Sequence, residues 1–225
     1  MTFSLVGHCE RTGMFGVSIT TSSICVGSRC PWVRAGVGAV ATQNVTDPAL
    51  GNAVLDLIEQ GEGAAVAIER VIDGRLHAEH RQLTAVDRHG GTAHFTGARI
   101  LGKNAVAVGT RCVAAGNLLA TQKLPAAMTA AFASANAEHI GERLLRALEA
   151  GVNAGGEEGT VHSAALLVAD RQPWPVVNLR VDWHDTNPIA ALRVLWEAYR
   201  PQIDDYVARA ANPDAAPSYG VPGDP

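Results

Sequence analysis

Apolar and small residues fill almost every position of the opening stretch, Met1–His8. Phe3 and Leu5 alternate with Ser4 and Val6, so the two-residue period of a half-exposed strand is followed only loosely. Such a run is typical of a strand that is buried on both faces. We therefore predict a strand that starts inside its own sheet, where its first residues are held in place.

Seven later segments carry the alternating or uniformly apolar pattern of strands, and they end at glycine or polar residues. They cover residues 14–20, 37–43, 83–87, 92–96, 111–117, 161–169 and 176–182. The first of them runs back beside the opening strand after a turn at 9–13, and a turn at 89–91 joins a second hairpin.

Apolar residues at helical spacing predict five helices. They span residues 49–60, 62–72, 124–135, 138–148 and 188–210, with Asp47-Pro48 starting the first and Gly151 closing the fourth. Helices come in pairs between antiparallel strands, which differs from the strict alternation of a parallel α/β sheet. We expect an α+β fold with two sheets between two helical layers. One domain is expected over residues 1–210, followed by a tail at 211–225 on the surface or on a partner subunit.

Composition narrows the classes of function. The chain has 225 residues, of which 47% are hydrophobic and 18% charged, as in a globular domain with a full core. A net charge of −4 without a cluster of Lys or Arg argues against a nucleic-acid partner. No apolar run is long enough for a membrane helix. The four Cys fit a reduced, cytoplasmic protein, and Cys25 and Cys30 lack further ligands at zinc spacing, so we expect neither a metal nor a cofactor.

Thr2 is a candidate nucleophile, because a side chain as small as Thr permits removal of Met1. The new first residue then carries a hydroxyl and an α-amine with a pKa of about 7.7–8.0, which is partly unprotonated near neutral pH. Such an amine activates an N-terminal Thr hydroxyl for attack. Many proteins of other kinds also start with Met-Thr, so the motif is weak by itself.

Other polar residues gather at predicted strand ends and glycine turns, where catalytic groups are rigidly held. They are Ser22, Ser23, Arg34, Gln43, Asn44, Asn117, Glu157, His162 and Ser163. Asn117 either stabilises an oxyanion or serves as a turn residue. Arg34 either binds a substrate carboxylate or forms a surface ion pair. Gln43 and Asn44 either hold an amide substrate or cap the next helix, and Glu157 lies in a loop that is either part of an active site or solvated.

Six stretches of the sequence resemble one family along nearly the whole chain. They are Met1–Val6, Pro31–Gln43, Ala115–Leu119, Ser163–Val168, Leu179–Asp182 and Asn212–Asp224. In these stretches the chain resembles the DUF1028 family of uncharacterised bacterial proteins, which have a fold similar to that of N-terminal-nucleophile (Ntn) hydrolases. The resemblance implies a four-layer αββα sandwich and strengthens Thr2 as the nucleophile, but it supplies no substrate.

The stretch Gly156–Ser163 departs from the pattern of that family. Where members commonly read Gly-Gly-Asp and then Gln-Ser-Ala-Ala, this chain has Glu157 and His162. The longer acid and the change from Gln to His suggest a different substrate, or a site that has lost its usual chemistry.

The leading hypothesis is a cytoplasmic amidohydrolase that cleaves a C–N bond in a small amide or lactam of catabolism. Thr2 would attack the carbonyl with its own α-amine as base, and Asn117 would hold the oxyanion. The substrate-binding residues would be Ser22, Ser23, Arg34, Gln43, Asn44, Glu157, His162 and Ser163.

Two alternatives stay open. The first is a non-catalytic, homo-oligomeric protein that binds a metabolite and keeps Met1. The second keeps hydrolysis but uses Ser22, Ser23 or Cys9 as the nucleophile. In every case we expect a dimer or larger assembly, because the last helix carries an apolar stripe with Leu192 and Trp196 and the tail is partly apolar.

Overall fold

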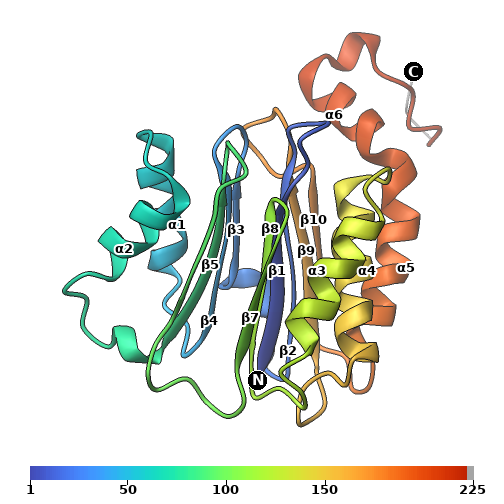
Figure 1. The fold of residues 1–225 in the computed structure, drawn as a ribbon. Coiled ribbons are helices and arrows are strands. Elements are labelled where there is room, and N and C mark those ends of the chain that lie inside the picture. Colours follow the sequence, from blue (N-terminus) through green and yellow to red (C-terminus); the bar gives the residue numbers. More distant parts are fainter. Residues whose placement is uncertain (222–225) are drawn as a thin grey trace.

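The computed structural model describes residues 1–221 and consists of two antiparallel sheets packed face to face between helices (Figure 1). The six-stranded sheet has the order β10-β9-β2-β1-β8-β7, and the four-stranded sheet has the order β3-β4-β5-β6. The strands are β1 Thr2–His8, β2 Phe15–Thr21, β3 Pro31–Arg34, β4 Gly38–Asn44, β5 Arg81–Asp87, β6 Thr92–Thr96, β7 Ala105–Gly109, β8 Cys112–Asn117, β9 Ser163–Ala169 and β10 Val177–Val181. The helices are α1 Ala49–Glu59, α2 Ala64–Ile72, α3 Leu124–Ser134, α4 Ile140–Asn153, α5 Pro188–Tyr199 and α6 Ile203–Ala211.

Helices α1 and α2 cover the outer face of the four-stranded sheet, and α3, α4 and α5 cover the outer face of the six-stranded sheet (Figure 1). Each amphipathic helix buries its apolar side on a sheet, as Leu50 and Val54 of α1 do beside Leu83 of β5. The predicted α+β class and the four-layer αββα arrangement are confirmed.

Strand β1 lies in the middle of the six-stranded sheet, between β2 and β8, and all seven of its residues are buried. Phe3 and Leu5 face the helical layer, whereas Val6 faces the other sheet. The side chain of Ser4 also points between the sheets and bonds to β4. The expected strand buried on both faces is therefore confirmed. The alternation is loose because one face of β1 packs on the helical layer and the other on the second sheet, and both exclude water.

Two edge strands were not expected from the sequence, β3 and β7. Strand β3 has only four residues and starts at Pro31, a residue that an edge strand tolerates because one row of its backbone groups has no partner. Strand β7 has only five residues, which are half-buried or exposed. Short strands of this kind are fixed by pairing with β4 and β8 rather than by their own pattern.

The predicted helix over 188–210 is wrong in one respect, because it is interrupted. A 3₁₀ turn, Arg200–Gln202, separates α5 from α6, since Pro201 has no N–H to donate and cannot continue a regular helix. Leu192 and Trp196, expected at a subunit contact, are fully buried within this chain instead.

Helix α4 is also longer than predicted, and it runs through Gly151 instead of stopping before it. A Cβ at Gly151 would lie 2.8 Å from Cε2 of Phe3, so this glycine permits close packing of α4 on β1 rather than ending the helix.

After α6 the chain folds back along that helix, and the guanidinium of Arg209 lies 4.0 Å from the ring centroid of Tyr219. The rest of the predicted tail, residues 222–225, lies outside the described residues. Within residues 1–221 every helix is too short or too polar to cross a membrane.

Candidate active site at the start of the central strand

Thr2 is the first residue of β1, and it pairs with Thr21 of β2 on one side and Asn117 of β8 on the other. Its side chain is buried. Thr2 Oγ1 lies 3.0 Å from Thr21 Oγ1 and donates a hydrogen bond of 2.6 Å to the Met1 carbonyl. The hydroxyl of Thr21 also donates to that carbonyl. Two hydroxyls therefore converge on the peptide bond that joins Met1 to Thr2.

The register of β8 places Glu157 in line with β1. Asn117 is opposite Thr2, and two residues further along β8 Leu119 forms an antiparallel bridge with Glu157. Hydrogen bonds from Glu158 N–H to Leu118 and from Ala120 N–H to Gly156 put this bridge on the side of β8 that faces away from β7. Glu157 thus lies next to the start of β1, close enough for the N-terminal ammonium of Met1 to act on its carboxyl group.

The carboxyl group of Glu157 is buried without compensation. The residue is 8% exposed, and neither carboxylate oxygen has a hydrogen-bond partner among the described residues. Burial raises the pKa of Glu157 to about 8, while the nearby N-terminal ammonium of Met1 acts in the opposite direction. A buried acid without a partner is costly, so this position favours a group that arrives from outside.

A chain of buried amides connects the two sheets beside Thr2. Ser4 Oγ donates to Gln43 Oε1 at 2.7 Å, and Gln43 Nε2 donates to Gln82 Oε1 at 2.7 Å. Asn117 Nδ2 donates to the same Gln82 oxygen at 3.3 Å, and Asn117 Oδ1 is buried with no hydrogen-bond partner among residues 1–221. The amide nitrogen of Asn117 carries two N–H bonds, of which Gln82 accepts one. The chain thereby fixes the orientation of the Asn117 amide next to the candidate nucleophile.

The rim of this site includes an arginine. Ser23 Oγ lies 3.4 Å from Thr21 Oγ1 and accepts a hydrogen bond of 2.7 Å from Arg29 Nη2. Arg29 Nη1 is held by two backbone carbonyls of the same loop, those of Ile24 and Cys25. The guanidinium of Arg29 is therefore connected to Thr2 through the hydroxyls of Ser23 and Thr21. Ser22, between Thr21 and Ser23 in the sequence, is half-buried.

Ser163 and His162 hold the rim loop in place. Ser163 is fully buried, donates to the Ser23 carbonyl at 2.6 Å and accepts the Val26 N–H at 3.1 Å. The backbone N–H of His162 donates to the Thr21 carbonyl at 2.8 Å. Its ring stacks on Trp183 with centroids 4.3 Å apart. Both residues lie beside the site, and the Ser163 hydroxyl is fully engaged in supporting it.

Arg34 does not belong to this group, and the expectation that it contacts substrate here needs correction. It lies opposite Gly38, five residues along β4 from Gln43, a span of roughly 17 Å in a strand. Its guanidinium pairs with Asp56 at 2.8 Å and Glu59 at 2.6 Å, which is the ordinary ion pair.

Asn44 is next to Gln43, but its side chain is already engaged. Nδ2 donates to the His80 carbonyl at 2.8 Å, and Oδ1 accepts the Leu101 N–H at 3.3 Å. Asn44 therefore joins two loops at the site end of the four-stranded sheet.

Thr21, Gln82 and Arg29 are site residues that the sequence did not reveal. Gln82 precedes the apolar run that predicts β5, and a single polar residue at a strand end looks like part of a loop. Arg29 lies in a glycine-rich loop with no local signal of its neighbours. Only the pairing of β5 with β4 and the anchoring of the loop by Ser163 bring them to Thr2.

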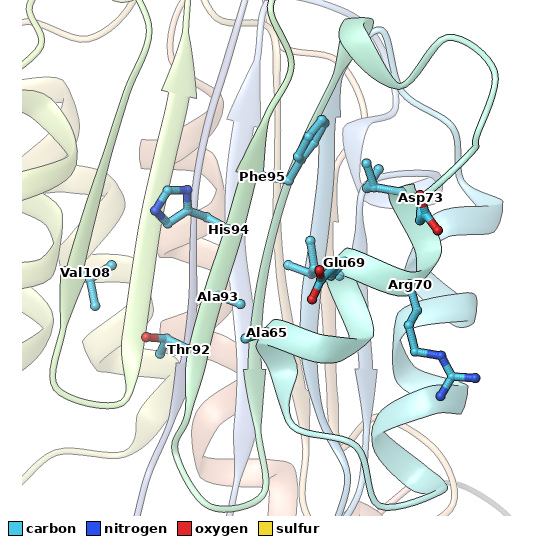
Figure 2. Close-up of a pocket in the computed structure, with 11 residues that line it drawn as sticks. Ala65, Glu69, Arg70, Asp73, Thr92, Ala93, His94, Phe95 and Val108 are labelled. Atoms are coloured by element: carbon cyan, nitrogen blue, oxygen red, sulfur yellow. The ribbon is translucent and has the colours of Figure 1, made fainter.

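Met1 fills the space in front of Thr2. The Met1 side chain packs against Gly159, where a Cβ would lie 2.8 Å from Met1 Cε. Five cavities stand out in the described part of the chain, and Thr2 lines none of them. The largest, of about 830 Å³, lies between α2 and β6 with Val108 of β7 at its edge (Figure 2). Over residues 1–221, no three His, Cys, Asp or Glu side chains form a metal-binding group.

Comparison with solved structures gives a strong match to another protein. The crystal structure of protein SPO2555 from Silicibacter pomeroyi, described as DUF1028, is 32% identical, covers 88% of each chain and has a TM-score of 0.82. Two Anbu (ancestral beta-subunit) structures are much more distant. Anbu from Yersinia bercovieri is 9% identical over 91% of this chain and 97% of its own, with a TM-score of 0.38. The Gly-1 mutant from Hyphomicrobium sp. is 13% identical over 90% and 96%, with a TM-score of 0.41. At this level the similarity indicates neither a common activity nor a common substrate.

No curated protein matches the sequence. The sequence model of DUF1028, described as a family of unknown function, matches residues 2–192, which include every strand and most of the helices. The chain belongs to the DUF1028 family.

Proposed function

We propose that this protein is a hydrolase of small amides or lactams that uses Thr2 as its nucleophile after removal of Met1. One observation supports the proposal: a buried Thr hydroxyl starts the central strand and bonds to the Met1 carbonyl, and a buried carboxyl without a partner among the described residues lies near the Met1 ammonium. Removal of Met1 would open a gap in front of Thr2, in the neighbourhood of Glu157.

The chemistry follows from the groups around that gap. The free α-amine of Thr2 takes the proton of Thr2 Oγ1, and the oxygen attacks the substrate carbonyl. The C–N bond then breaks, the leaving nitrogen takes the proton, and the acyl group stays on Thr2 as an ester. Water hydrolyses the ester and returns the free hydroxyl.

The neighbouring residues have distinct roles in this proposal. Thr21 Oγ1, at 3.0 Å from Thr2 Oγ1, orients the nucleophile. The amide of Asn117, fixed by Gln82, is the side-chain candidate for holding the oxyanion. Glu157 faces the substrate from the far end of the gap and selects for an N–H or a cationic nitrogen, which its oxygens lack in the unprocessed chain.

A β-lactone probe tests this mechanism without knowledge of the substrate, because a nucleophilic hydroxyl opens the ring and retains the whole probe. We expect intact mass spectrometry to show loss of Met1 and then addition of one lactone per processed chain. Thr2→Ala should still lose Met1 but take up no lactone, with at least about a 1,000-fold loss in turnover of any amide found by screening.

Ser134→Ala is the matched control, since it removes an exposed hydroxyl that bonds only within α3 and should keep both labelling and turnover. If labelling survives in Thr2→Ala but is lost in Ser22→Ala, Ser23→Ala or Cys9→Ala, the residue whose substitution abolishes labelling is the nucleophile instead of Thr2. Active protein that fully retains Met1 would exclude Thr2.

A second candidate is supported by the way Met1 packs. Met1 closes the site and contacts Gly159, as expected for a non-catalytic protein that keeps its first residue and binds a metabolite elsewhere. It predicts full retention of Met1 and no effect of Thr2→Ala on ligand binding.

Two further expectations belong to this proposal. The four cysteines are free, which supports a cytoplasmic location. Val194 and Leu195 of α5 are 65% and 40% exposed, which supports a homo-oligomer that covers this helix.

A further inference from the structure

The opposite end of β1 borders a second pocket of different character. A cavity of about 440 Å³ lies there, lined by the β1–β2 turn, the β7–β8 turn and the facing ends of α3 and α4. His8, the last residue of β1, is part of its wall. Six residue steps of a strand separate His8 from Thr2, a span of roughly 20 Å. An occupant of this cavity would therefore not compete with chemistry at Thr2.

Arg143 of α4 is the most unusual residue of this pocket, because its charge is buried without a carboxylate. It is 4% exposed, and its guanidinium carbon lies 3.8 Å from the ring centroid of Phe132. Arg143 Nε donates to the Phe132 carbonyl at 3.1 Å, and the thiol of Cys9 is a further neighbour. No ion pair joins Arg143 to an acid within residues 1–221. A guanidinium in such a position is costly unless an anion reaches it.

Two more arginines face the same cavity. Arg11 donates to the carbonyls of Ala137 and Glu138 at 3.2 Å, which fixes its guanidinium over the pocket. Arg111 donates to the His89 carbonyl at 2.8 Å and pairs with Glu10.

The charges in the wall sum to a clear positive excess. Three guanidinium groups and the single carboxylate of Glu10 give 3 − 1 = +2 with His8 neutral, in a chain whose net charge is −4. Thr110 and Asn136 add neutral donors to the same wall. Arginine forks of this kind match the oxygens of phosphate and carboxylate groups, often with two parallel hydrogen bonds.

We propose that this cavity binds the phosphate or carboxylate group of a small metabolite, with Arg143 at its base and Arg11 and Arg111 at its rim. The anion compensates the buried charge of Arg143, which the fold leaves unpaired. The proposal is independent of the one for Thr2, since it needs neither Met1 removal nor catalysis.

Titration calorimetry on the full chain, with inorganic phosphate and with succinate as separate ligands, tests the proposal. A titration with sodium chloride at equal ionic strength serves as the reference for general charge screening. We expect saturable binding of at least one of the two, and the anion that binds identifies the group recognised. Arg11→Ala, an exposed position that leaves the core intact, should weaken binding at least about tenfold. Arg143→Met should abolish it.

Arg99→Ala is the matched control, because it removes an equally charged side chain that is 68% exposed and outside the cavity wall. It should bind the anion as the unaltered chain does, and so should Thr2→Ala. If Arg143→Met does not fold, the comparison of anion affinity between Arg11→Ala and Arg99→Ala decides whether the proposal holds. The absence of saturable binding of both anions, or equal affinity in Arg11→Ala and Arg99→Ala, overturns the proposal.

Discussion

Two glutamates are buried to almost the same extent in this protein and behave in opposite ways. Glu142 in α4 is 6% exposed and Glu157 in the loop after α4 is 8% exposed. Burial alone would raise the pKa of Glu142, but hydrogen bonds from Arg193, Arg146 and Trp196 outweigh it and lower the pKa to about 2. Burial raises the pKa of Glu157 to about 8, because no such donors oppose it.

The difference shows how partners decide the role of a buried acid. Glu142 accepts bonds of 2.7 Å from Arg193, 2.6 Å from Arg146 and 2.8 Å from Trp196, and it ties α4 to α5. The carboxylate of Glu157, beside the start of β1, accepts no hydrogen bond from the residues that the structure describes. The first arrangement is a finished structural contact, whereas the second leaves the carboxyl open to the substrate or new N-terminus that we propose.

Glu142→Gln should have the largest effect on stability. Because the folded pKa is lowered, Glu142 contributes stability above its unfolded pKa of roughly 4.3, and this is lost as the pH falls toward 2. We expect Glu142→Gln to lower the free energy of unfolding by about 3 kcal/mol at pH 7 and by much less at pH 2.5, measured by urea denaturation.

Glu138→Gln is the control for that change, since Glu138 is 44% exposed and lies 3.5 Å from the same Arg146. It should shift the free energy of unfolding by less than about 0.5 kcal/mol. A similar loss in both variants would show that Glu142 has no special structural role.

Glu157→Gln should have the opposite sign. A folded pKa raised above the unfolded value means that the folded state holds its proton more tightly, so stability is present below about pH 4.3 and declines as the pH rises through 8. We expect Glu157→Gln to raise the free energy of unfolding by about 2 kcal/mol at pH 9 and to leave it unchanged at pH 4. Chains whose intact mass includes Met1 should be used for this titration.

The neighbouring Glu158 provides the control, because its carboxylate is 43% exposed and pairs with Lys103 at 3.1 Å. Glu158→Gln should give no pH-dependent gain. Destabilisation by Glu157→Gln at pH 9 would mean that the Glu157 carboxylate has a favourable partner. That result would contradict the contrast with Glu142.

Thr21→Val should have the smallest effect on stability, about 1 kcal/mol, because it removes one buried hydroxyl that contacts Thr2 and Met1. Amide turnover should fall more, by about 10- to 100-fold, since the nucleophile loses its orienting partner. Thr186→Val, at an exposed position, serves as the control in thermal unfolding and activity assays. Equal turnover in the two variants would remove Thr21 from the proposed mechanism.

Much of the fold could be predicted from the sequence because its pattern is local. The doubly buried run at Thr2–His8 and the helix pairs lead directly to the two sheets and two helical layers. The edge strands β3 and β7 and the break at Pro201 were missed, since pairing with neighbours and one missing N–H decide them.

The candidate site was less predictable because it depends on register between distant segments. Thr2, Asn117 and Glu157 were proposed separately, and pairing across β8 brings them together. The same pairing brings in Gln82, which has no local signal. Arg34 carried a plausible charge but lies at the other end of its sheet, and nothing in its neighbours along the chain indicates which end.

The central place of β1 also sets an order of events during synthesis. Thr2 pairs with Asn117, which lies 115 positions further along the chain, so β1 stays unpaired on that side until β8 has left the ribosome. At about 5–20 residues per second this takes on the order of ten seconds, during which an aminopeptidase reaches Met1 freely. Once β8 and the Glu157 loop have closed around it, the same bond is half-buried between two hydroxyls. The removal of Met1 that we propose would therefore compete with completion of the sheet.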